Sequence, residues 1–127
     1  MTPMPHTVGR DIPLNTALGL MREHRIRHLP VQDAGELVGM LTDRDLRLAS
    51  SFAEGEQLTV DDVMTPDPYA VAPETPLDHV VREMAEKKLG SAVVQQGNGK
   101  VVGIFTAVDA LNVLADTLAT FYKGGQL

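Results

Sequence analysis

Residues 39–45 read GMLTDRD, and residues 103–109 read GIFTAVD. Both stretches place a glycine, two apolar residues and a Thr-x-x-Asp segment in the same order. A short apolar run that ends in threonine is typical of a buried strand followed by a helix that the threonine caps. The pattern therefore predicts the same strand-to-helix junction twice in one chain.

The repetition extends outward from these junctions over almost the whole chain. From Met64 onward the sequence repeats the order of its opening residues, starting with Met-Thr-Pro in both copies, with one residue inserted near Asn98. Self-similarity at a fixed spacing indicates repeated structural units. We therefore divide the chain into repeat 1, residues 1–60, and repeat 2, residues 61–127, joined through the polar stretch 51–57.

Each repeat predicts an extended opening segment followed by a helix. Apolar residues recur at helical spacing and form one stripe: Leu14, Ala17, Leu18 and Met21 in repeat 1, and Leu77, Val80, Val81 and Met84 in repeat 2. In repeat 2 we expect Thr75 to be the N-cap and Pro76 the first helical residue, because proline lacks the N–H that is unpaired there.

A hairpin and a second helix complete each repeat. Apolar runs 28–32 and 37–41, and 91–95 and 101–105, flank short turn-forming segments and predict antiparallel pairs. The last helix of repeat 2 carries an apolar stripe and is expected to stop at Gly124–Gly125. Its stripe comprises Leu111, Leu114, Leu118 and Phe121. The fold class is therefore α+β, with helices packed on small sheets.

Composition excludes several classes of function. The 127 residues carry a formal charge of −6, which argues against nucleic-acid binding because phosphate backbones attract lysine and arginine. Cysteine is absent, so thiolate chemistry and cysteine-bound metals are excluded. No apolar run reaches the roughly 20 residues of a membrane-spanning helix, and the N-terminus does not resemble a signal peptide. We expect a soluble, cytoplasmic protein that does not bind membranes.

The Thr-x-x-Asp junctions are the candidate chemistry of the chain. Thr42 with Asp45, and Thr106 with Asp109, fall in the first turn of a helix, where N–H groups are unpaired and the partial charge is positive. A carboxylate held there suits the two neighbouring hydroxyls of a ribose. A single such junction more often only caps its helix. Its duplication in two packed units favours a ligand between them.

Four short segments, one of which contains the first junction, resemble a CBS-domain pair, or Bateman module. They are the Met-Thr-Pro openings at residues 1–3 and 64–66, RHLPV at 27–31, and GMLTDRDL at 39–46. The resemblance implies two β-α-β-β-α units related by a pseudo-twofold axis. It also implies non-catalytic binding of an adenosyl ligand, namely AMP, ADP, ATP or S-adenosylmethionine, as a regulatory ligand and with no required cofactor or metal.

The resemblance assigns roles to individual residues. Ribose would be held by Thr42, Asp45, Thr106 and Asp109. The adenine would be lined, mostly through backbone groups, by Leu29, Pro30, Val31, Thr65, Pro66, Ala92 and Val93. The phosphates would face Arg27, His28 and Arg44. Repeat 2 departs from this pattern, because Gly90, Ser91 and Val108 replace those three basic residues.

Two other functions fit the sequence. The chain could be a ligand-free structural or dimerisation module, as the weak basic complement of repeat 2 suggests. More remotely, Asp43 and Asp45 could serve a small metal-dependent enzyme. We also expect a homodimer, because the apolar helix faces exceed what one pair of repeats can cover, and a regulated protein partner of unknown identity. The faces in question carry Leu46, Leu77, Val81, Leu111 and Leu114.

Overall fold

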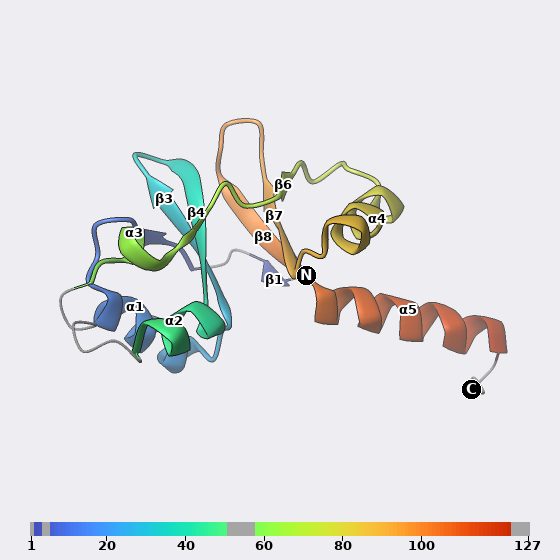
Figure 1. Ribbon diagram of the computed structural model, residues 1–127. Coiled ribbons are helices and arrows are strands. Elements are labelled where there is room, and N and C mark those ends of the chain that lie inside the picture. The colour runs from blue at the N-terminus through green and yellow to red at the C-terminus, as the bar shows by residue number, and fades with distance from the viewer. Residues whose placement is uncertain (1, 4–5, 51–57, 123–127) are drawn as a thin grey trace.

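The computed structural model describes residues 2–3, 6–50 and 58–122 and shows an α+β fold made of two similar halves (Figure 1). The expected joining stretch 51–57 and the expected helix stop at Gly124–Gly125 lie outside the described residues. The first half contains β1 (Thr2–Pro3), β2 (Val8–Gly9), α1 (Leu14–His24), β3 (His28–Asp33), β4 (Glu36–Thr42) and α2 (Asp43–Ser50).

The second half repeats this order after one additional short helix, α3 (Val60–Val63). It contains β5 (Thr65–Pro66), β6 (Ala70–Val71), α4 (Leu77–Lys87), β7 (Ser91–Gln95), β8 (Val101–Thr106) and α5 (Ala107–Tyr122). The duplicated β-α-β-β-α architecture is therefore confirmed, although each opening segment forms two very short strands and not one.

Two four-stranded sheets have equivalent strand orders, β1-β8-β7-β6 and β5-β4-β3-β2. The expected hairpins are confirmed, because β3 pairs antiparallel with β4 and β7 pairs antiparallel with β8. Both hairpins turn at a glycine with positive φ, +82° at Gly35 and +86° at Gly99, a conformation that side chains disfavour.

The opening strands are exchanged between the halves. β1, from the start of the chain, pairs with β8 of repeat 2, and β5, from the start of repeat 2, pairs with β4 of repeat 1. Each sheet therefore contains three strands from one repeat and one short strand from the other. This exchange links the halves through backbone hydrogen bonds as well as through side-chain packing.

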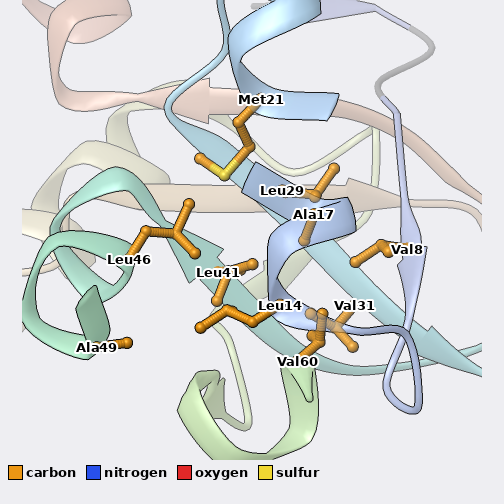
Figure 2. Close-up of a cluster of buried hydrophobic side chains, with 10 residues drawn as sticks. All are labelled: Val8, Leu14, Ala17, Met21, Leu29, Val31, Leu41, Leu46, Ala49 and Val60. Carbon is orange, nitrogen blue, oxygen red and sulfur yellow. The ribbon is translucent and has the colours of Figure 1, made fainter. Parts of the chain in front are cut away.

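Repeat 1 has a core that α1, α2, the short helix α3 and its sheet enclose (Figure 2). The stripe of α1 turns inward through Leu14, Ala17 and Met21, as its periodicity predicts. The second helix, α2, contributes Leu46 and Ala49 to the same core. Our expectation that Leu46 belongs to a surface for a second chain is therefore wrong, because that side chain is buried within its own repeat.

Repeat 2 has a smaller core that α5 does not complete. Its buried members are Val80, Met84, Ala92 and Phe105. None of residues 107–122 is buried against the described chain, and Figure 1 shows α5 running away from the sheets toward the C-terminus. The helix was expected and is present, but among its residues Ala110, which is partly buried, packs against this core and none is fully buried.

Side chains from both sheets also pack between the repeats. Met40 of β4 forms a buried cluster with Val93 of β7 and Val101 of β8. Alternation along β7 explains this contact, since Ala92 faces the core of repeat 2 and the next residue, Val93, points the other way. The halves are thus joined by a small apolar interface.

The start of α4 differs from the expectation by one residue. The helix begins at Leu77 with Pro76 at the N-cap, where ψ is 135° and therefore extended, and no side chain caps it. Pro13 has the same role before α1, with ψ of 140°. Thr75 is therefore not the cap, because proline fixes only φ and its ψ remains outside the helical range.

Candidate functional site

In repeat 1, Thr42 and Asp45 form a reciprocal pair at the start of α2. The Thr42 backbone N–H donates to Asp45 Oδ2 at 3.0 Å, and the Asp45 backbone N–H donates to Thr42 Oγ1 at 3.1 Å. The pair satisfies two of the N–H groups that a helix start leaves unpaired. It also holds the carboxylate in one orientation at the positive end of the helix.

Repeat 2 builds the same pair at the start of α5. The Thr106 backbone N–H donates to Asp109 Oδ2 at 2.8 Å, and the Asp109 backbone N–H donates to Thr106 Oγ1 at 3.2 Å. All four bonds of the two pairs are partly buried. The structure therefore brings each predicted threonine and aspartate together, with the same geometry in both repeats.

The exchanged strands place the Thr-Pro segments beside these pairs. Thr65 and Pro66 pair with Met40 and Gly39, just before Thr42 on β4. Close approach explains the glycine: a Cβ on Gly39 would overlap the Met64 side chain and lie 3.1 Å from the Thr65 carbonyl oxygen. The Thr-Pro segment of repeat 2 thus adjoins the Thr-Asp pair of repeat 1.

Thr2 and Pro3 take the equivalent place in the other sheet, opposite Ile104 and Gly103, just before Thr106. The sequence assignment named only the second Thr-Pro segment and missed the first. The repetition of Met-Thr-Pro was the signal that could have identified it. The motif could not show that each segment crosses to the other repeat, because strand exchange depends on tertiary pairing.

The residues assigned to the adenine fall into two groups. Leu29, Pro30, Val31, Ala92 and Val93 are buried in β3 and β7, so their side chains are occupied in packing. At these five positions a ligand could therefore be met by backbone groups but not by the buried side chains. The other group, the segment 65–66, is exposed.

The three basic residues assigned to phosphate lie around the start of β3 and α2. Arg27 and Arg44 are exposed, and His28 is partly buried and pairs with Thr42 across the hairpin. The Arg27 carbonyl accepts from the Asp43 N–H at 3.2 Å, which fixes this corner. In repeat 2 the position opposite Thr106 belongs to Ser91, so the corner carries no basic side chain.

His28 lies within the electrostatic reach of both repeats. Burial lowers the pKa of His28 below its ordinary value near 6.5, while the Asp43 carboxylate opposes that shift and the Arg27 guanidinium adds to it. The carboxylates of Asp109 in repeat 2 and Asp45 in repeat 1, like that of Asp43, oppose the lowering of the His28 pKa. This histidine therefore experiences the carboxylates of both Thr-Asp pairs.

The described residues offer no group of three or more histidine and carboxylate side chains placed to hold a metal ion. Asp43 lies 3.7 Å from Arg47 as an i,i+4 ion pair, and Asp45 is held by Thr42. Among the described helices none is both long and apolar enough to cross a bilayer.

A family model described as "CBS domain" matches residues 1–51 and 60–116. The chain is 36% identical over 121 residues to inosine-5'-monophosphate dehydrogenase of Korarchaeum cryptofilum, which covers 95% of this chain but 25% of that enzyme. The chain thus spans about a quarter of that relative. It is also 32% identical to the CBS domain-containing protein YhcV of Bacillus subtilis, covering 94% of this chain and 86% of YhcV.

Solved structures show the same fold. CBSX2, a protein of Arabidopsis thaliana, in complex with AMP has a TM-score of 0.77 at 29% identity, covering 92% of this chain and 93% of CBSX2. The domain pair of protein MJ0100, in complex with 5'-methylthioadenosine and S-adenosyl-L-methionine, has a TM-score of 0.82 at 27% identity, with coverage of 92% and 93%. Both similar structures therefore hold ligands that contain adenosine.

Proposed function

Since the chain belongs to the CBS domain family, we propose that it is a non-catalytic regulatory module that binds an adenosine-containing ligand, either AMP, ADP, ATP or S-adenosylmethionine. The observation that carries the proposal is the pair of partly buried Thr-Asp junctions, each beside the exchanged Thr-Pro segment of the other repeat. The adenosyl ligands of CBSX2 and MJ0100 support this ligand class.

In this proposal the ribose hydroxyls hydrogen-bond to the carboxylates of Asp45 and Asp109, with Thr42 and Thr106 as their partners. Backbone groups of β3 and β7, together with the Thr-Pro segments, line the adenine. Arg27, His28 and Arg44 neutralise the phosphates on the repeat 1 side. A ligand that favours one packing of the repeats would shift the population toward it, and a protein partner would respond to that shift.

The two repeats differ in the number of basic side chains beside their Thr-Asp pairs, and this difference supports different ligand affinities at the two sites. Gly90, Ser91 and Val108 stand where repeat 1 has three basic residues. A ligand without phosphate groups, such as S-adenosylmethionine, suits the side that lacks them. The same inequality favours the second candidate function, a module that binds no ligand and serves only dimerisation.

The proposal includes the division of the chain at residue 60 and a cytoplasmic homodimer that acts on a further protein. The match to a domain-sized part of a dehydrogenase supports a regulated enzyme as one class of partner. Binding in trans to a separate enzyme, or in cis within a longer chain, would serve the same regulation.

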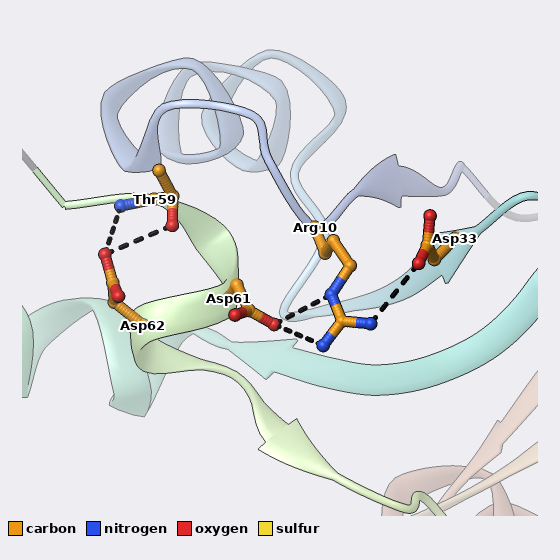
Figure 3. A network of polar contacts seen from close by, with 5 residues as sticks. All are labelled: Arg10, Asp33, Thr59, Asp61 and Asp62. Atoms are coloured by element: carbon orange, nitrogen blue, oxygen red, sulfur yellow. Dashed lines mark hydrogen bonds and ion pairs between the residues drawn. The ribbon is translucent and has the colours of Figure 1, made fainter.

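Calorimetric titration with AMP, ATP and S-adenosylmethionine tests the ribose role. Asp45→Asn and Asp109→Asn should each abolish or weaken one binding event at least ~10-fold, because a hydrogen-bonded charge is lost at the ribose. The chain offers a matched control: Asp62 caps α3 through Thr59, with 2.9 Å between the Thr59 backbone nitrogen and Asp62 Oδ2, and it has no assigned ligand role (Figure 3).

Asp62→Asn removes a comparable helix cap and should therefore leave the affinity for each nucleotide unchanged. This control separates an effect on ligand binding from an effect on the stability of the fold. Unchanged affinity in both Asp45→Asn and Asp109→Asn would reject the ribose assignment. Absence of any thermal stabilisation of the wild-type chain by all three ligands would favour the ligand-free module, because a ligand that binds the folded state must stabilise it.

A further inference from the structure

We propose that His28 of repeat 1 also serves the nucleotide site of repeat 2, as a side chain shared between the two Thr-Asp pairs. The shared histidine makes the affinity of that site for phosphate-bearing ligands rise as the pH falls. The inference rests on the proposed function and deepens it, because it names a cation for the side on which Gly90, Ser91 and Val108 replace basic residues.

The face of β3 that carries His28 is the face that meets repeat 2. The next residue, Leu29, points into the core of repeat 1. Pro30 lies opposite Met40, and Met40 packs against Val93 of repeat 2. Side chains alternate along a strand, and the pairing of the hairpin is regular over these residues. His28 therefore points to the same side as Pro30, toward the other repeat.

The equivalent corner of repeat 2 faces repeat 1 in the same way. Ser91 lies two residues before Val93 in β7, on the same face, and it pairs with Thr106. His28 likewise pairs with Thr42. Both corners at which the Thr-Asp helices start are therefore turned toward the contact between the repeats. A histidine occupies one of these corners, and a serine occupies the other.

The electrostatic surroundings of His28 agree with this placement. The charged groups that act on it are Arg27 before β3, Asp43 and Asp45 in α2, and Asp109 in the first turn of α5. Because Coulombic interactions weaken with distance, the Asp109 carboxylate must lie near the face of β3 that carries His28. A single partly buried side chain therefore lies within reach of the carboxylates of both pairs.

His28 can change its charge in response to a ligand. Burial lowers the pKa of His28, so its ring is mostly neutral at pH 7 in the free chain. A ribose bound at Asp109 brings its phosphate toward this ring, and the added negative charge favours the imidazolium form. Binding of the phosphate therefore takes up a proton. By linkage, the affinity for the phosphate increases as the pH falls toward the pKa of His28 in the free chain.

The two sites should differ in this respect. Arg27 and Arg44 keep their charge throughout the accessible pH range and serve the phosphates of repeat 1. Repeat 2 has Gly90 and Val108 at the equivalent positions, so its phosphate affinity depends on His28. At neutral pH the site of repeat 2 favours a ligand without phosphate, and at lower pH it accepts AMP as well.

Calorimetric titration of the full chain with AMP tests the shared role in the Asp45→Asn variant, which retains the Thr-Asp pair of repeat 2. Adding His28→Ser should weaken AMP binding at least ~5-fold at about pH 5.5 and less than ~2-fold at about pH 8, because the lost cation is charged only at the lower pH. The ratio of the two dissociation constants cancels the titration of the AMP phosphate, which both chains share. Asp45→Asn removes one carboxylate that opposes the lowering of the His28 pKa, so the dependence moves toward lower pH.

Matched controls isolate the charge of His28. His28→Arg in the same variant should retain AMP affinity and remove the part of its pH dependence that comes from the protein, because guanidinium stays charged. His79→Ser removes an exposed histidine of α4 and should leave AMP affinity unchanged. Adenosine, which carries no phosphate, should bind the Asp45→Asn chain equally at both pH values.

Proton uptake gives a second measurement of the same role. Titrations of the Asp45→Asn chain with AMP in two buffers of different ionisation enthalpy report how many protons enter on binding. The uptake should be positive and should be smaller after His28→Ser, once the contribution of the AMP phosphate is subtracted. An uptake that His28→Ser does not change would contradict the shared role.

The outcomes separate this inference from the proposed function. If Asp45→Asn and Asp109→Asn both leave AMP affinity unchanged, the ribose role is wrong and the shared role falls with it. If the Asp45→Asn chain binds AMP with an affinity that His28→Ser does not alter at any pH, the proposed function stands and His28 serves repeat 1 alone. An Asp45→Asn chain that binds adenosine but not AMP at about pH 5.5 also overturns the shared role.

Discussion

Repeat 1 folds its last helix, α2, beside α1 and buries Leu46 and Ala49, whereas repeat 2 buries no residue of α5 and only its Ala110, partly exposed, packs against the core. The two helices follow equivalent strands and start with the same Thr-Asp pair. The difference therefore arises after the first turn, where α5 is longer and carries Leu111 at the position of Arg47, whose side chain is 77% exposed in α2. One duplicated unit can thus close its core with its last helix in one copy and leave that helix largely exposed in the other.

The cores of the two repeats also divide their volume differently across the same strand pair. Leu29 lies opposite Leu41 in repeat 1, and at the equivalent positions Ala92 lies opposite Phe105. A pair of medium side chains has been exchanged for one small and one large. The two pairs contain the same number of side-chain carbon atoms, divided differently between the strands.

The backbone differs at one further equivalent position. The Val93 N–H donates to the Tyr69 carbonyl at 2.8 Å, joining β7 to the residue before β6. Pro30 occupies the corresponding place in β3 and has no N–H to donate. In repeat 1 the parallel pairing accordingly begins one residue later, at Val31.

The largest effect should come from truncating the buried Leu29 side chain in the core of repeat 1. Leu29→Ala should destabilise the chain by about 2–5 kcal/mol, because the fully buried side chain leaves a cavity. Adding Leu41→Phe recreates the pairing of repeat 2 and should recover part of the loss, with a coupling of about 0.5–3 kcal/mol. Urea unfolding of the single and double variants measures both terms. If the changes in unfolding free energy of the two single variants simply added in the double variant, the side chains at positions 29 and 41 would not be energetically coupled.

A smaller loss should follow from Gly39→Ala, which tests the crossing strand. The new Cβ would press on Met64 and on the Thr65 carbonyl, so we expect a loss of about 1–3 kcal/mol in urea unfolding. Gly35→Ala makes the same change at a turn whose backbone is strained for alanine but where no heavy atom lies within 4 Å. If hydrogen exchange in β4 and β5 were unchanged by Gly39→Ala, close approach of these strands would be refuted.

His28 should give the repeats different sensitivities to pH. Because the folded chain lowers the pKa of His28, the unfolded chain binds a proton more readily. The unfolding free energy therefore has its full value, as far as His28 is concerned, at pH above the ordinary histidine pKa near 6.5. It decreases as the pH falls from there through the folded-state pKa of His28. His28→Ser, which installs the residue of repeat 2, should flatten the decline in melting temperature below about pH 6.5. A decline as steep as in wild type, with exposed His79→Ser as the control, would exclude His28 as its source.

The smallest effect should come from Arg10, which has no counterpart because Pro73 occupies the equivalent position. Its guanidinium lies 2.7 Å from Asp61 Oδ1 and 3.3 Å from Asp33 Oδ2 at the surface (Figure 3). Arg10→Met should lower stability slightly, and about 1 M salt should reduce the difference between variant and wild type by screening. A difference that does not change with salt would show that the network is not electrostatic in origin.

Local patterns predicted much of the fold, for identifiable reasons. The stripe of α1, both hairpins and the Thr-Asp pairs depend on neighbours within a few residues, so periodicity and spacing specify them. Strand exchange at Thr65 and the exposure of α5 depend on distant parts of the chain, and no local pattern specifies them. The assigned site residues divide in the same way: the sequence identified each pair, but it missed Thr2 and Pro3.

The exchanged opening strands bear on how such a chain could arise by duplication. A single repeat lacks the short strand that completes the far edge of its sheet, beside β4 or β8. If an isolated ancestral unit used the same pairing, it would have received that strand from a second molecule of its own kind. Two such molecules would have associated reciprocally, and gene fusion would then have made an intermolecular partnership permanent within one polypeptide.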